Sequence, residues 1–248
     1  MRGFWPVYKR ELLSLFVTPT AWVLIIVFLI IQGFHFYGMV VHFAQNAELS
    51  VDQGPVQAFF GESILFYLPL ILLCPGMTMR LFAEERRSGT IETLLTAPVH
   101  TAGIVLGKFA AAFTMYVAMW LPTVLYIVVL RRAGEIDWNV VATSYIGVAL
   151  IGAGYLAVGT LMSAMTDSQL VAIILSALVI LGLFVIGIGE FIFDAGVLHD
   201  FCAYVSVWGQ MGELSKGIVD LRRIVLDVTL IALPLFITVR AVDAWRWG

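Results

Sequence analysis

The most polar segment of the chain, residues 84–93, carries the side chains best suited to pairing with another protein. It holds three glutamates, two arginines and three hydroxyl residues, and apolar runs long enough to span a bilayer flank it on both sides. Such a segment must lie in water between two membrane helices. The helical spacing of Glu84 and Ser88, with apolar residues following at 91, 94 and 95, predicts a short amphipathic helix over residues 82–96.

No other set of residues has the spacing of a catalytic or metal site. The four histidines are scattered over both sides of the predicted membrane region, and no serine or threonine lies in a nucleophile elbow or beside a suitable base. Glycines between residues 33 and 38 have the spacing of a phosphate loop, but Met39 stands where the lysine is needed, and the run is apolar. We therefore expect no catalytic residue, no metal ligand and no nucleotide site on this chain.

The elements that must position the polar segment are membrane helices. The chain is 61% hydrophobic and 12% charged, with a mean hydropathy of +0.97, whereas about 25% of the residues in a soluble domain are charged. Only helices satisfy their backbone groups across the apolar lengths found here, so the sequence predicts an all-α integral membrane protein, with a single domain over residues 1–248. The expected spans are about 20–43, 59–79, 102–130, 140–163, 169–190 and 224–241.

The distribution of positive charge gives the expected orientation, because lysine and arginine are enriched on the cytoplasmic side. Six spans place both termini on one side, and that side then holds nine of the 14 lysines and arginines. We therefore expect both termini and residues 84–93 in the cytoplasm. The middle of the predicted spans lacks the charged residues by which ion-driven carriers couple protons or sodium.

Two further segments are expected at the membrane surfaces. Residues 4–17 have an amphipathic helical pattern, which suits either an aromatic anchor for the first span or a surface that also touches a cytoplasmic partner. Residues 191–223 alternate aromatic with polar side chains, so we expect one or two short re-entrant helices on the external side. The candidate residues are Trp5, Tyr8, Lys9 and Arg10 in the first segment, and Trp208, Asp220 and Arg222 in the second.

The fourth span is rich in small residues. Ala149, Ala153 and Ala157 recur at four-residue spacing, with Gly152 and Gly159 beside them. Small residues in register allow the backbones of membrane helices to approach closely. The pattern predicts that this span packs tightly against its neighbours.

The polar segment also resembles a known signature. Residues 84–99, EERRSGTIETLLTAPV, are similar to the cytoplasmic signature of ABC-2 type permeases, the membrane subunits of ATP-binding-cassette exporters. The nearest branch is the one that holds the gliding-motility-associated permease and the permease of nitrous oxide reductase maturation. Residues 8–12 and 217–222 resemble the same branch. An acidic residue usually follows residue 222 in this branch, where the present chain has Arg223, which puts in question any salt bridge made there by relatives.

The resemblance implies a six-span subunit of the bacterial inner membrane that works as a dimer with two cytoplasmic ATPase subunits. ATP and magnesium would bind to those partners, so this chain would be no enzyme. The second permease would be another copy or a sister chain, with an extracytoplasmic accessory protein as a further partner and no nucleic acid. Residues 82–96 would be the coupling helix, 4–17 an interfacial connecting helix and 191–223 an external lid. The residues expected to couple to the ATPase are Glu84, Glu85, Arg86, Arg87, Gly89, Thr90, Glu92 and Leu95.

Two other functions are open to a chain with six membrane spans. A non-transporting membrane anchor, through which an ATPase drives an envelope machine or an accessory protein, needs the same cytoplasmic helix. A secondary carrier is disfavoured by the uncharged middle of the spans. The apolar spans and the aromatic external segment suit lipids, peptides or other amphiphiles equally well, so the sequence does not identify a substrate.

Overall fold

Within the residues that the computed structural model describes, 3–45, 54–61, 63–90, 99–133 and 135–245, the chain forms helices and no strands. Six helical stretches in these ranges are long and apolar enough to cross a membrane, which confirms the predicted all-α architecture with six spans. These stretches are Pro19–Gln45, Ile64–Arg87, Thr101–Arg132, Trp138–Met165, Gln169–Phe191 and Leu221–Ala244.

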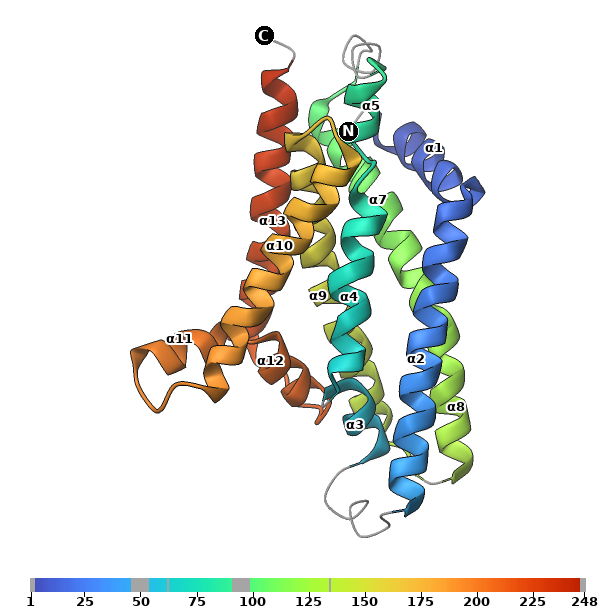
Figure 1. Ribbon diagram of the computed structural model, residues 1–248, viewed down its shortest axis with the longest axis vertical. Helices are drawn as coiled ribbons and strands as arrows, with labels where there is room; N and C mark the ends of the chain where they lie inside the picture. Colours follow the sequence, from blue (N-terminus) through green and yellow to red (C-terminus); the bar gives the residue numbers. More distant parts are fainter. Residues whose placement is uncertain (1–2, 46–53, 62, 91–98, 134, 246–248) are drawn as a thin grey trace.

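The long helices form an elongated bundle with both chain termini at one end (Figure 1). We call this the termini end and the opposite one the distal end. The short helix α5 (Ala83–Arg87) also lies at the termini end, beside α1 (Phe4–Val17). The long helices of the bundle are α2 (Pro19–Gln45), α4 (Ile64–Thr78), α7 (Thr101–Trp120), α8 (Val124–Ala133), α9 (Trp138–Met165), α10 (Gln169–Ile188) and α13 (Leu221–Ala244).

Helix α9 occupies the centre of the bundle and contacts α4, α7, α10 and α13. Of its most apolar window 78% is buried, against 22% for both α2 and α13. Neighbouring side chains fill the space that its glycines leave: a Cβ at Gly152 would overlap the ring of Tyr116, and one at Gly159 would overlap the hydroxyl of Thr78. The predicted close packing of this span is confirmed.

The start of the second span differs from the prediction. We expected one helix from about residue 59, but Pro55–Gly61 form a separate short helix, α3, and α4 begins only at Ile64. Ser63 separates the two helices, because its extended backbone and its Oγ, which accepts from the backbone N–H of Leu65 at 3.2 Å, cap the start of α4. This cap lies within an apolar run, and it was not recognised from hydrophobicity.

Helix α1 is set at an angle to α2, and Thr18 separates them with an extended backbone (Figure 1). Pro19 then begins α2, as proline does in a first helical turn. Helix α1 packs on α7 through the buried side chains of Val7 and Leu15. The approach is close at Gly107, where a Cβ would lie 3.1 Å from the carbonyl oxygen of Phe4.

The segment before the last span contains two short helices, α11 (Val197–Val205) and α12 (Val207–Leu214). Helix α11 extends sideways from the bundle (Figure 1), whereas α12 packs against α3 and α9. Ser206 separates the two helices, and its Oγ caps α12 by accepting from the backbone N–H of Gly209 at 3.0 Å.

Candidate functional site

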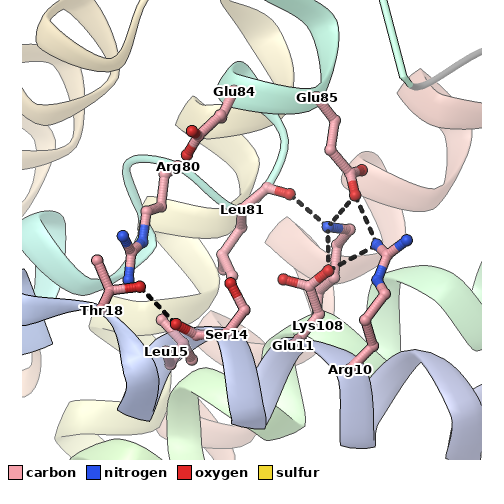
Figure 2. Close-up of a pocket in the computed structure, with 10 residues that line it drawn as sticks. All are labelled: Arg10, Glu11, Ser14, Leu15, Thr18, Arg80, Leu81, Glu84, Glu85 and Lys108. Atoms are coloured by element: carbon pink, nitrogen blue, oxygen red, sulfur yellow. Dashed lines mark hydrogen bonds and ion pairs between the residues drawn. The ribbon is translucent and has the colours of Figure 1, made fainter. Parts of the chain in front are cut away.

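Four charged side chains from three elements meet beneath α5 (Figure 2). Lys108 of α7 places its Nζ 3.0 Å from Oε1 of Glu11 on α1 and 3.0 Å from Oε1 of Glu85 on α5. Arg10 places its Nη2 2.7 Å from Oε1 of Glu11 and 2.6 Å from Oε1 of Glu85. These two cations and two anions, which we call the ion-pair cluster, join α1, α5 and α7.

Burial makes Lys108 the centre of the ion-pair cluster. Its side chain is 1% exposed, against 13% for Glu11, 16% for Glu85 and 54% for Arg10. A buried ammonium group is costly unless it is paired and hydrogen-bonded. Besides the two carboxylates, Lys108 donates to the carbonyl oxygen of Leu81 at 2.6 Å, so each of its three protons has an acceptor within reach.

The position of Lys108 within α7 explains how it reaches α5. It lies seven residues after the start of the helix at Thr101, which is about 10 Å at 1.5 Å per residue. Side chains of a helix point toward its N-terminus, which in α7 lies at the termini end, and a lysine stem can pass along apolar neighbours while the charged head reaches polar groups. The ammonium group is therefore carried back toward α5.

The charge of Glu11 makes the stability of the ion-pair cluster depend on pH. Burial raises the pKa of the Glu11 carboxyl, but the charges of Lys108 and Arg10 and the hydrogen bonds that they donate outweigh burial and hold the pKa below its usual value. A carboxyl with a lowered pKa in the folded protein stabilises it above the unfolded pKa, and this contribution is lost as the pH falls through the folded pKa. The stability that the charge of Glu11 contributes is therefore lost below about pH 4.5, the ordinary pKa of glutamate.

We expect the substitution Glu11→Gln to lower the midpoint of thermal unfolding in detergent at pH 7. The difference from the unsubstituted chain should remain down to about pH 4.5 and shrink at lower pH. Parallel melting curves from pH 3 to pH 7 measure it. A difference that is the same at pH 3 and pH 7 would show that the charge of Glu11 does not stabilise the fold.

Helix α5 has a second set of contacts, with α9 and α13. Arg86 donates through Nη1 to the carbonyl oxygen of Ala164 at 3.3 Å and stacks on the ring of Trp245, with 4.8 Å from Cζ to the ring centroid. Ser163 accepts the backbone N–H groups of Phe82 and Ala83 at 3.1 and 3.2 Å. These N–H groups belong to the start of α5, so a side chain of α9 holds α5 in place.

The remaining residues of α5 and those after it are exposed. Arg87, Ser88, Gly89 and Thr90 lie on the surface of the termini end, and Glu84 is also exposed. Helix α5 ends at Arg87, and Gly89, the residue after its C-cap Ser88, has a φ of +71°, a left-handed conformation that favours glycine. Two of the residues predicted to couple, Glu92 and Leu95, lie outside the described residues, as does the rest of the helix predicted to reach residue 96.

The candidate residues of α1 are divided between its faces. Trp5 is exposed and stacks on Tyr8 at 5.5 Å between ring centroids, and Lys9 Nζ lies 5.2 Å from the Trp5 ring centroid. The hydroxyl groups of Tyr8 and Thr114 are hydrogen-bonded at 3.1 Å, which ties α1 to α7. Of the four residues predicted in this helix, only Arg10 belongs to the ion-pair cluster.

The candidate residues between α11 and α13 have local structural contacts. Trp208 stacks on Tyr67 of α4 at 5.0 Å between ring centroids. Asp220 caps α13 by accepting from the backbone N–H of Arg222 at 2.9 Å, and the side chain of Arg222 is exposed. Arg223, which replaces the acidic residue of the resembled branch, pairs with Glu213 of α12 at 3.2 Å.

Three residues of the site were not predicted from the sequence: Glu11, Lys108 and Ser163. Lys108 had a usable signal, because a lysine two turns inside an apolar helix must find partners. Glu11 and Ser163 had none, since their roles depend on contacts with residues 97 and about 80 positions away in the chain. Within the described ranges, no group of three or more histidine, cysteine, aspartate or glutamate side chains is arranged to hold a metal ion.

Comparison with known proteins adds a family match to this geometry. Residues 42–208 match the model of the ABC-2 family transporter proteins. The match covers more than half of the chain and includes α4, α5 and Lys108, whereas α1 and α13 lie outside it. A search of curated proteins finds no match.

Proposed function

The chain belongs to the ABC-2 family of transporter proteins, and from that premise we propose that it is the membrane-spanning subunit of an exporter driven by a separate ATPase. In this proposal, residues after Pro19 cross the bacterial inner membrane and the termini end faces the cytoplasm. The described basic residues support this orientation, because Lys9, Arg10, Arg80 and Lys108 lie at the termini end, where positive charge is expected in the cytoplasm.

The observation that carries the proposal is the position of α5 between two groups of helices. Through Glu85 it is bonded to α1 and α7, and through Arg86 and its backbone it is bonded to α9 and α13. Movement of α5 would therefore displace four elements of the bundle together. A short exposed helix with this connectivity is suited to transmit force from a soluble partner to membrane helices.

The partner would contact the exposed part of this segment. Arg87 and Ser88 are exposed, and no atom of the described residues lies within 4 Å of where a Cβ of Gly89 would stand. We assign the docking of the ATPase to this exposed face. Glu85 and Arg86, expected from the sequence to meet the ATPase directly, serve in this proposal to pass its movement to the bundle.

Two ATPase subunits and a second permease subunit complete the proposed assembly. The apolar faces of α2, α10 and α13 are largely uncovered within one chain, which suits contact with lipid and with another permease, either a second copy or a sister chain. The helices α11 and α12 lie on the external side in this orientation and would cover the exit path.

Arg87→Glu tests where the ATPase docks. Reversal of this exposed charge should weaken binding of the cognate ATPase about fivefold. An exposed ion pair contributes up to about 1 kcal/mol, which corresponds to that factor in the dissociation constant. The binding is measured with the chain in lipid nanodiscs and purified ATPase at low salt. Arg132→Glu is the matched control, because Arg132 is also exposed but lies at the distal end. Equal affinity for the two variants would contradict the assignment.

A further inference from the structure

A cavity of about 380 Å³ lies between α1, α5, α7 and the segment that follows α4 (Figure 2). The ion-pair cluster forms one side of it. The other side is formed by the segment after α4 and the last two turns of α1, where Arg80 reaches toward Thr18. Glu84 lies above it. Of the ten described residues that line the cavity, eight have charged or hydroxyl side chains, and the other two are Leu15 and Leu81.

The charges of this cavity leave one cation and one anion without an ion pair. Arg10, Lys108, Glu11 and Glu85 pair among themselves. Among the residues that the structure describes, Arg80 and Glu84 form no ion pair, and Arg80 makes only one long hydrogen bond, from Nη1 to Oγ1 of Thr20 at 3.4 Å. The cavity therefore offers a ligand one positive charge, on Arg80, and one negative charge, on Glu84.

One acceptor in the cavity is also unused. Oε2 of Glu85 is buried, and no hydrogen-bond donor lies within reach of it in the described part of the chain. A buried carboxylate oxygen without a donor is costly. A group that enters the cavity and donates hydrogen bonds would therefore gain from contact with Glu85 as well as Glu84.

The cavity lies at the level of a membrane surface. On the face of α1 turned away from it, Trp5, Leu13 and Val17 are exposed, as expected for a helix whose apolar stripe rests on lipid. One turn into α2, Trp22 is 53% exposed and donates through Nε1 to the carbonyl oxygen of Phe16 at 2.8 Å. Exposed tryptophans gather at the headgroup level, which is the depth of the α1–α2 junction.

We propose that this cavity binds the headgroup of phosphatidylethanolamine, with the phosphate on Arg80 and the ammonium group on Glu84 and Oε2 of Glu85. A zwitterionic headgroup carries one charge of each sign and so complements Arg80 and Glu84. The primary ammonium group donates three hydrogen bonds, as lysine does, whereas the quaternary group of phosphatidylcholine donates none. The lipid would brace α1 against α5 without contacting the proposed ATPase-docking face at Arg87.

The test is lipid retention by the full-length chain. The chain is purified in detergent, equilibrated with mixed micelles of phosphatidylethanolamine, phosphatidylcholine and phosphatidylglycerol in equal amounts, and analysed by native mass spectrometry. We expect phosphatidylethanolamine to be retained about tenfold over each of the other two, the ratio that one charge-assisted hydrogen bond provides. Soluble phosphoethanolamine should compete only weakly, whereas full displacement by it would show that the cavity holds a free metabolite rather than a lipid.

Two variants locate the site. Glu84→Gln should abolish the preference for phosphatidylethanolamine over phosphatidylcholine, and Arg80→Gln should weaken retention of both. The double variant Arg80→Glu with Glu84→Arg keeps the same net charge but reverses its direction, and it should also lose the lipid. Melting curves identify any variant that fails to fold, and Arg132→Gln, at the distal end, is the neutral control.

Two results overturn the proposal. The first is equal retention of the three lipids by the unsubstituted chain. The second is unchanged lipid retention in Glu84→Gln and Arg80→Gln together with weakened binding of the ATPase, which would show that the cavity receives a side chain of that partner. Failure of the ATPase to bind the unsubstituted chain would contradict the proposed function and leave the lipid result standing, since lipid retention is measured without the ATPase.

Discussion

Replacement of Lys108 by methionine should destabilise the folded chain by about 3–5 kcal/mol, the cost of removing one partner from a buried ion pair. Methionine fills a similar volume, but it leaves the carboxylates of Glu11 and Glu85 with only the half-exposed Arg10 between them. The carbonyl oxygen of Leu81 loses its donor as well. Reversible denaturant titration of the chain in detergent micelles, at pH 7 and constant micelle concentration, measures the change.

Two controls separate loss of the ion-pair cluster from loss of a lysine. Lys216→Met makes the same chemical change at an exposed position and should alter the unfolding free energy by less than about 0.5 kcal/mol. The triple variant Lys108→Met with Glu11→Gln and Glu85→Gln should recover most of the loss, because neutral side chains do not leave buried charges unpaired. If Lys108→Met is as stable as Lys216→Met, the ion-pair cluster does not hold α1, α5 and α7 together.

Gly152→Ala should disrupt the packing of α9 on α7. The new Cβ would overlap Cζ and the hydroxyl oxygen of Tyr116, so the ring must move. That movement removes the hydrogen bond from the Tyr116 hydroxyl to the carbonyl oxygen of Val148, now 2.9 Å. Overpacking and a buried hydroxyl without a partner together should cost about 2–5 kcal/mol, measured by the same titration.

Gly154→Ala is the matched control for this change. It lies two residues away on α9, where a Cβ would meet only Cβ of Leu230 at 3.7 Å, an ordinary contact. Because alanine favours a helix over glycine, this variant should be neutral or slightly stabilised. The double variant Gly152→Ala with Tyr116→Ala should be less destabilised than the sum of its parts. Similar losses for Gly152→Ala and Gly154→Ala would mean that α9 and α7 are not in close contact at Tyr116.

The spans were predictable because lipid imposes a length and a composition that apolar runs reveal directly. The tight packing of α9 was predictable for a related reason, since glycines such as Gly152 have no other common use inside a membrane helix. The start of α4 was not predictable from these signals. Glu62 and Ser63 form a break of only two polar residues between the apolar residues of α3 and α4, which is too short to end a span by hydrophobicity alone.

The candidate site was predictable as a segment but not as a set of contacts. Charge density located α5, yet Glu85 and Arg86 are adjacent in sequence and face different helices, one toward Lys108 and the other toward Ala164 and Trp245. Which neighbour a charged side chain meets depends on how the spans pack. A single sequence contains no direct record of that packing, so Glu11 could not be paired with Lys108 across 97 positions.

In the proposed mechanism, an ATPase docked near Arg87 moves α5, and Glu85 passes the movement to α1 and α7. Binding and coupling should therefore be separable. Residues on the exposed face should control affinity for the ATPase, whereas residues that join α5 to the bundle should control what binding does to the rate of ATP hydrolysis.

The most direct test measures ATP hydrolysis by the cognate ATPase with the chain reconstituted in nanodiscs, for the unsubstituted chain and for Glu85→Gln and Glu135→Gln. The two variants make the same chemical change, but Glu85 is paired with Arg10 and Lys108, whereas Glu135 is exposed between α8 and α9, outside both proposed sites. We expect both variants to bind the ATPase with unchanged affinity and Glu85→Gln alone to lose most of the stimulation of hydrolysis. Equal stimulation by Glu85→Gln and the unsubstituted chain, at equal occupancy by the ATPase, would contradict the proposed mechanism.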